Sequence, residues 1–169
     1  MISVMRIRLA VAGLALASTV LAADPPTLRL ESSAARPITP QSLLGADRTD
    51  VRLEDAQGGD VTVFHGLPLL AVLEKAGLET KTMPSQRKLA AATVVATARD
   101  GYAVVFSVGE LLMHRADPRV FLVAETAAGP LPEDNGPVRL VVYGDRARSA
   151  YALARLEVRF LAANPPAKK

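Results

Sequence analysis

Charged and aromatic side chains that could bind a ligand occur in the C-terminal half of the chain, on segments that are otherwise apolar. Glu110 lies within the apolar segment 108–113, where a carboxylate must either face water or find a hydrogen-bond donor. Arg139 alternates with Val141 and Tyr143 in a β-rich run, so these three side chains share one face of the expected strand. That face is either exposed to water or forms the floor of a pocket. A guanidinium carries five donors in a fixed geometry, which suits the polar edge of a planar ligand or an anionic group.

Other candidate residues have structural explanations of their own. Asp100 and Tyr102 flank a glycine in a sequence typical of a tight hairpin turn, with Tyr102 at the start of the next strand. We expect a mainly structural role for this turn, with a ligand contact as the alternative. Arg139 also has a structural alternative, because a buried ion pair with Glu110 or Asp134 would satisfy its charge without a ligand.

The residue types required for several common chemistries are missing or isolated. The chain has no Cys and two His, and neither His65 nor His114 belongs to a closely spaced set of metal ligands. No G-x-S-x-G nucleophile motif, dinucleotide-binding motif or phosphate-binding loop occurs. The sequence therefore gives no support to a nucleophilic hydrolase, a dedicated zinc or copper site, or nucleotide binding.

Hydrophobic periodicity and turn residues predict a mixed α+β domain of short strands and short helices. Helices are expected at 39–44, 68–76 and 107–113, with Thr39 and Ser107 as N-caps and Gly77 as a terminator. Strands are expected at 27–31, 49–54, 60–64, 92–98, 102–106, 120–124, 138–143 and 154–161.

The expected strands differ in burial, and two segments between the elements read as loops. The continuously apolar run 120–124 predicts a strand that is buried on both faces, whereas the alternation in 154–161 predicts one wet face. The polar segment 80–88 is expected to be an exposed loop, and 128–137 a long turn rich in Gly and Pro.

Residues 1–22 have the features of a signal peptide for the general secretory route. Arg6 and Arg8 precede a 13-residue apolar run that is too short to span a bilayer, and small residues follow it. An uncleaved N-terminal anchor is the alternative. Cleavage after Ala22 would leave 147 residues with a net charge of +1, the size of one domain with no basic run for nucleic acid. We expect a periplasmic protein with a domain over 23–162 and a disordered tail over 163–169.

A series of short motifs runs through most of this expected domain. They are G-L-P-L-L at 66–70, L-E-K-A-G at 73–77, D-G-Y at 100–102, S-V-G-E-L at 107–111, F-L-V-A at 121–124, G-P-L at 129–131 and G-P-V-R-L-V-V at 136–142. In their types and order they resemble the molybdopterin-binding domain of the sulfite-oxidase superfamily. The resemblance implies a concave pocket that recognises a pterin, with the G-P-x-R-L loop and strand beside it.

The resemblance also implies a set of ligand-binding residues and a departure from the redox members. The residues that would bind the pterin are Asp100, Tyr102, Glu110, Asp134, Arg139, Tyr143 and Arg148. Redox members bind molybdenum through a cysteine thiolate, and this chain has no Cys, so we expect no molybdenum. Relatives often carry an Arg-Trp pair near Arg148, where this chain has Ser149, so stacking at that point would require Tyr143 or Tyr151.

The resemblance, together with the missing Cys, implies a periplasmic, non-catalytic pterin-binding sensor that passes a signal to a membrane-bound signalling protein. One alternative is a molybdopterin-dependent oxidoreductase, or a subunit of one, in which another residue replaces the thiolate. A second alternative is a protein-interaction module that binds no ligand. Metal analysis separates the first alternative from the other functions, and a binding assay with free pterins separates the sensor from the second alternative.

Overall fold

The computed structural model describes residues 24–30, 33–54 and 61–160, and they form a mixed α+β fold, as the sequence predicts. The predicted signal peptide at 1–22 and the predicted tail at 163–169 lie outside the described residues. Within those residues, two five-stranded sheets form two layers.

The first sheet has the strand order β2-β1-β10-β5-β6, in which β1 runs parallel to β10 and the other neighbours are antiparallel. Its strands are β1 (Thr27–Leu30), β2 (Arg36–Pro37), β5 (Ala92–Ala98), β6 (Ala103–Ser107) and β10 (Leu153–Phe160). The predicted alternation in β10 is confirmed, because Leu156 and Val158 are buried whereas Arg155 and Arg159 are exposed. One face of this strand is therefore in contact with water.

The second sheet is arranged around β7, which pairs with β4 on one edge and with β8 and β9 on the other. Its strands are β3 (Thr49–Glu54), β4 (Val61–Pro68), β7 (Val120–Thr126), β8 (Gly129–Pro130) and β9 (Arg139–Val142). The run 120–124 is buried throughout, as predicted. Leu122 faces the main core, and Val123 faces a second, smaller core that includes Phe64 and Val141.

The strand β4 is longer than the sequence predicts and includes His65 and Gly66. The pairing of β4 with β7 shifts by one residue between these two positions, which indicates a β-bulge. A Cβ atom at Gly66 would lie 2.0 Å from the carbonyl oxygen of Leu122. Only glycine permits this close approach of the two backbones.

Local capping signals fix the ends of three helices as predicted. In α1 (Pro40–Leu43) the Thr39 hydroxyl accepts a hydrogen bond from a first-turn N–H, and Ser107 does the same for α4 (Val108–Met113). The helix α2 (Leu69–Lys75) is terminated by Gly77, which follows the C-cap residue Ala76 and has a φ of +106°. The N–H of Leu78 reaches the carbonyl of Leu73 at 2.9 Å, a Schellman geometry that explains the sharp end of this helix.

The prediction of an exposed loop at 80–88 is wrong, because most of this segment forms the helix α3 (Met83–Leu89). The helix begins with Thr82 at its N-cap and a proline in its first turn. Leu89 is buried, whereas the preceding polar residues face water wholly or in part. A proline and polar residues fill the sequence between Met83, which is exposed, and Leu89, so no hydrophobic periodicity indicated the helix.

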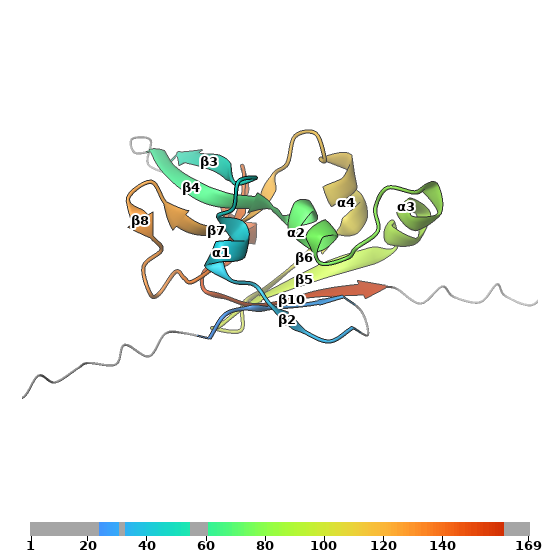
Figure 1. The fold of residues 1–169 in the computed structure, drawn as a ribbon, viewed down its shortest axis with the longest axis horizontal. Helices are drawn as coiled ribbons and strands as arrows, with labels where there is room; N and C mark the ends of the chain where they lie inside the picture. Colours follow the sequence, from blue (N-terminus) through green and yellow to red (C-terminus); the bar gives the residue numbers. More distant parts are fainter. Residues whose placement is uncertain (1–23, 31–32, 55–60, 161–169) are drawn as a thin grey trace, which may run out of the picture.

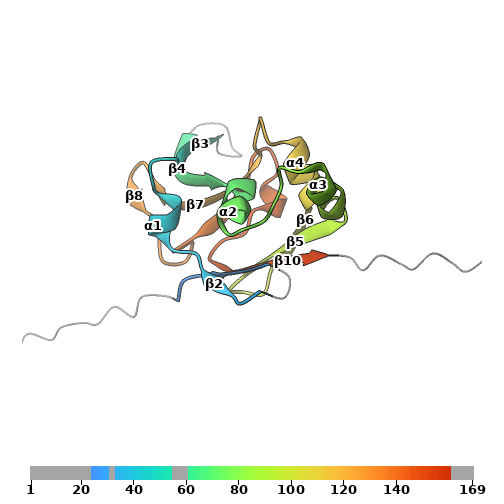
Figure 2. The same ribbon diagram turned by 45° about the vertical axis from the view of Figure 1, so that its right-hand side comes forward.

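The main core lies between the two sheets and is built around α2. Figures 1 and 2 show the sheet that contains β5 and β10 along the bottom, with α2 above it and the sheet that contains β4 and β7 beside that helix. Its most deeply buried members come from both sheets and the helices between them, and they include Leu69, Leu73, Phe106, Leu122 and Leu156. Burial of each such side chain contributes about 1.5–3 kcal/mol to folding.

None of the helices in the described residues has the length and apolar character needed to cross a membrane.

Candidate functional site

A cavity of about 350 Å³ lies where the chain passes between the two sheets. It is bounded by α2, by α4 and the segment that follows it, and by the segment from the end of β9 through the 3-10 helix η1 (Arg146–Arg148). Its volume lies within the range of small-molecule binding sites. Its residues are Pro68, Leu70, Ala71, Glu74, Glu110, Leu111, His114, Arg115, Pro118, Arg119, Val120, Val142, Tyr143, Gly144, Asp145 and Arg148.

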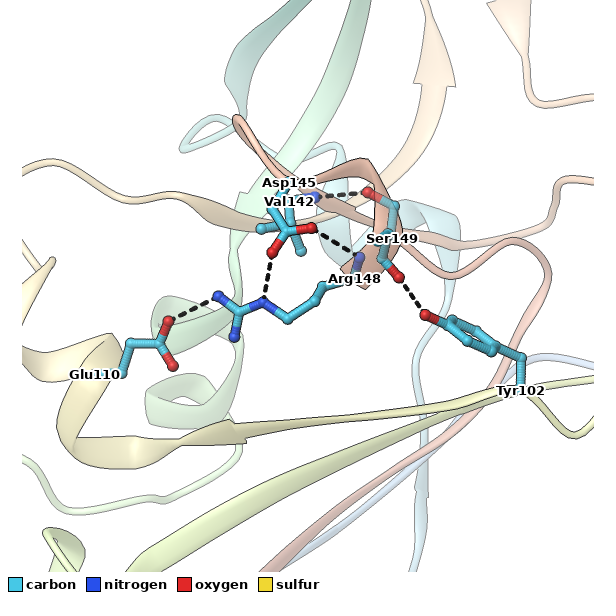
Figure 3. Close-up of polar contacts among 7 residues, drawn as sticks. Tyr102, Glu110, Val142, Asp145, Arg148 and Ser149 are labelled. Atoms are coloured by element: carbon cyan, nitrogen blue, oxygen red, sulfur yellow. Dashed lines mark hydrogen bonds and ion pairs between the residues drawn. The ribbon is translucent and has the colours of Figure 1, made fainter.

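Arg148 binds two carboxylates on one wall of this cavity. Its Nη2 donates to Oε1 of Glu110 at 2.9 Å, and its Nε donates to Oδ2 of Asp145 at 3.0 Å (Figure 3). The guanidinium also lies over the ring of Phe106, 4.9 Å from its centroid. The hydrogen bond to Glu110, together with the bond to Asp145, raises the pKa of Arg148 above its usual value. The guanidinium therefore stays charged and holds both carboxylates in place.

Local structure explains how these three side chains come together. Ser107 caps α4 and so places Glu110 in the first turn of that helix. Asp145 is the N-cap of η1, and its Oδ1 accepts from the backbone N–H of Arg148 at 3.2 Å. The Asp145 carboxylate thus binds both the backbone and the side chain of Arg148, which restricts the orientation of the guanidinium.

Two further contacts hold the η1 segment in place. The buried Ser149 hydroxyl accepts from the N–H of Val142 at 3.0 Å, which ties the residue after η1 to β9 (Figure 3). The hydroxyl of Tyr102 donates to the carbonyl oxygen of Ala147. Tyr102, in the turn between β5 and β6, therefore supports this wall of the cavity without lining the cavity itself.

A second ion pair also lines the cavity. Nη1 of Arg115 donates to Oε1 of Glu74 at 2.7 Å, and its Nη2 donates to the hydroxyl of Thr80 at 2.8 Å. Thr80 is buried, and its hydroxyl donates to the same Glu74 carboxylate. These bonds join the end of α2 to the segment that follows α4. His114, the C-cap residue of α4, lines the cavity next to Arg115.

The structure brings three of the seven residues predicted to bind a ligand to the cavity, namely Glu110, Tyr143 and Arg148. Asp100 lies in the hairpin turn, where its carboxylate accepts from the N–H of Tyr102 at 2.9 Å. Asp134 accepts from Nδ2 of Asn135 at 3.2 Å and is not among the cavity-lining residues. The last of the seven, Arg139, lies elsewhere.

Arg139 is not among the residues that line this cavity, and the neighbouring Val141 on the same face of β9 is buried in the smaller core. Its guanidinium lies 3.9 Å from the ring centroid of Tyr151 and 5.2 Å from that of Phe64. The alternative, an ion pair with Glu110 or Asp134, is not formed among the described residues, where Glu110 binds Arg148 and Asp134 accepts from Asn135. Burial lowers the pKa of Arg139, and its buried Nε has no hydrogen-bond partner within the described chain.

Sequence reasoning missed several charged residues of the cavity. Glu74 had a usable signal, because it lies four residues after Leu70 and therefore on the same face of α2. Asp145 also had a local signal, since Asp is a favoured N-cap. Arg115 and Arg119 lie in an irregular segment, whose path cannot be derived from periodicity.

Among residues 24–30, 33–54 and 61–160, no group of three or more His, Asp or Glu side chains is arranged to hold a metal ion. We find no protein-family model that matches this chain and no curated protein to which its sequence is significantly similar.

Proposed function

We propose that this chain is a periplasmic pterin-binding protein that uses the cavity beside Arg148 and does no redox chemistry. The observation that carries the proposal is the Glu110 carboxylate on the cavity wall, where Arg148 binds one of its oxygens at 2.9 Å. Its other oxygen makes no hydrogen bond to the residues that the structure describes. A pterin presents an amino N–H and a ring N–H side by side, and an ionised carboxylate is the acceptor that suits such donors.

The remaining surface of the cavity suits the flat faces of a pterin ring. Leu70, Leu111, Val120 and Val142 are buried apolar residues that line it. Ligand pockets typically combine such apolar walls with a small number of polar groups that fix the orientation of the ligand. Tyr143 adds an aromatic ring at the exposed side of the cavity, where it could stack on a planar ligand.

The residues of the cavity do not fit a molybdenum centre of the sulfite-oxidase kind. Such a centre is bound through a cysteine thiolate, and the chain has no Cys. We therefore assign a binding function and infer that the protein acts through a partner, a membrane-bound signalling protein. The η1 segment could transmit ligand binding to such a partner. A ligand that contacts this segment would favour the conformation of the segment that binds the ligand best.

The test is pterin binding by the wild type and by the Glu110→Gln variant, measured by calorimetry with a reduced pterin. The substitution keeps the shape of the side chain but removes its charge, so affinity is expected to fall by about 1.5–3 kcal/mol, or roughly tenfold to a hundredfold. The matched control is Glu157→Gln, which removes a carboxylate from β10, outside the cavity. Failure of the wild type to bind, or equal affinity of the wild type and Glu110→Gln, would refute the proposed site.

A further inference from the structure

The charged side chains on the two walls of the cavity are unevenly paired. Arg115 and Glu74 form a one-to-one ion pair at 2.7 Å and so are neutral together. Arg148 is shared between Glu110, at 2.9 Å, and Asp145, at 3.0 Å. One guanidinium thus faces two carboxylates, and this group carries one excess negative charge. A ligand with N–H donors at one end would match it.

The compensating positive charge lies on Arg119. This residue is exposed, and its side chain makes no ion pair with any part of the chain that the structure describes. It lies next to Tyr143 across the end of the β7–β9 pair, because its carbonyl oxygen accepts from the N–H of Tyr143 at 2.7 Å. Both residues line the same cavity as the Glu110–Arg148–Asp145 group. The cavity therefore has excess negative charge on the Glu110–Arg148–Asp145 group and, on Arg119, a guanidinium that forms no ion pair with the described residues.

We propose that Arg119, with Tyr143 beside it, binds an anionic substituent of the ligand, so that the preferred ligand is a pterin that carries an acidic group. The inference rests on the proposed function, because it places the ring of that pterin against Glu110 and its acidic group against Arg119. A guanidinium presents two parallel N–H donors that match a carboxylate or phosphate, and a phenol adds a third donor. Arg115 and Arg148, by contrast, each donate two side-chain hydrogen bonds to protein groups: Arg115 to a carboxylate and a hydroxyl, and Arg148 to two carboxylates.

The experiment compares two pterins that differ only in this respect, 6-carboxypterin and the uncharged 6-hydroxymethylpterin. Binding of each is measured by fluorescence at neutral pH to the wild type, to Arg119→Gln and to Arg87→Gln. Arg87 is a matched control, since it is an exposed arginine on α3 that does not line the cavity. Circular dichroism verifies that both variants are folded.

We expect the wild type and Arg87→Gln to bind 6-carboxypterin roughly tenfold more tightly than 6-hydroxymethylpterin. In Arg119→Gln this preference should disappear while the affinity for 6-hydroxymethylpterin stays unchanged. The preference should also shrink as salt is raised, because an exposed charge pair is screened. Equal binding of the two pterins by the wild type, or an undiminished preference in Arg119→Gln, overturns the inference and leaves the proposed function intact. Binding of neither pterin overturns the inference, and it overturns the proposed function as well if the wild type also fails to bind the reduced pterin.

Discussion

Replacement of Gly66 by alanine should destabilise the fold more than any conservative change on the surface, because β4 and β7 are in backbone contact there. An added Cβ atom would lie 2.0 Å from the carbonyl oxygen of Leu122 and 2.7 Å from Cα of Val123. Both are backbone atoms, so no side chain can rotate away to make room. The two strands would have to move apart by roughly 1 Å or more to restore an ordinary carbon–oxygen contact.

The size of the effect follows from the costs of that movement. Overpacking of a close-packed interior costs about 1–3 kcal/mol, and a weakened ladder hydrogen bond costs about 1 kcal/mol more. The reduced freedom of alanine in the unfolded chain offsets about 0.4–1 kcal/mol of this. We therefore expect Gly66→Ala to lower the free energy of unfolding by about 2–3 kcal/mol, and the melting temperature by roughly 5–10 °C for a domain of this size.

Urea and thermal unfolding, followed by circular dichroism, measure this loss. Gly45→Ala is the matched control, since a Cβ atom at Gly45 meets nothing within 4 Å and should leave stability the same or slightly higher. If Gly66→Ala unfolds at the same urea concentration as the wild type, the strands do not approach as closely as the structure indicates. The register of β4 against β7 would then need revision.

Two further predictions concern a surface ion pair and the proposed partner. Arg159 donates to Glu157 at 2.6 Å and lowers the pKa of that carboxyl, so the wild type should be more stable than Glu157→Gln by about 0.5 kcal/mol above the usual pKa of a glutamate. This difference should vanish as the pH falls through the lowered pKa, and urea unfolding of both proteins across the acid range measures it; a difference that persists at low pH contradicts the assignment. Co-purification from the periplasm, with and without added pterin, should recover a membrane-bound partner in a ligand-dependent manner, and recovery of none under either condition contradicts the signalling role.

Features that depend on neighbouring residues could be derived from the sequence. Gly77 ends α2 and Ser107 begins α4 because a positive φ and a hydroxyl acceptor act within one turn of the helix. The interior of α3 gave no comparable signal, since Leu89 is buried but Met83, at the other end of the helix, is exposed. Periodicity detects a helix through its apolar face, and a helix with a minimal apolar face escapes it.

Features that depend on tertiary packing could not be derived in this way. Alternation correctly grouped Arg139 with Val141 on one face of β9, but it could not indicate whether that face is covered. Phe64 and Tyr151, which cover it, lie 75 residues before and 12 residues after Arg139 in the sequence. Glu110 was predicted to need a donor or water, yet its donor, Arg148, is 38 residues away. When two residues are this far apart in the sequence, the topology of the fold determines whether they come into contact.

The topology also explains why the charged residues gather where they do. The chain passes between the sheets through α2 after β4, through α4 after β6, and through η1 after β9, and these three connections line the cavity. A connection between layers belongs to neither ladder of strands, so its polar groups outside the helical turns are satisfied by side chains, by water or by a ligand. Substitutions on the connections, such as those at Glu110 and Arg119, should therefore change binding while the sheets stay intact. A substitution at Gly66 should affect both the sheet and the cavity. Gly66 lies in β4 just before α2, so a shift of β4 also moves the α2 wall of the cavity.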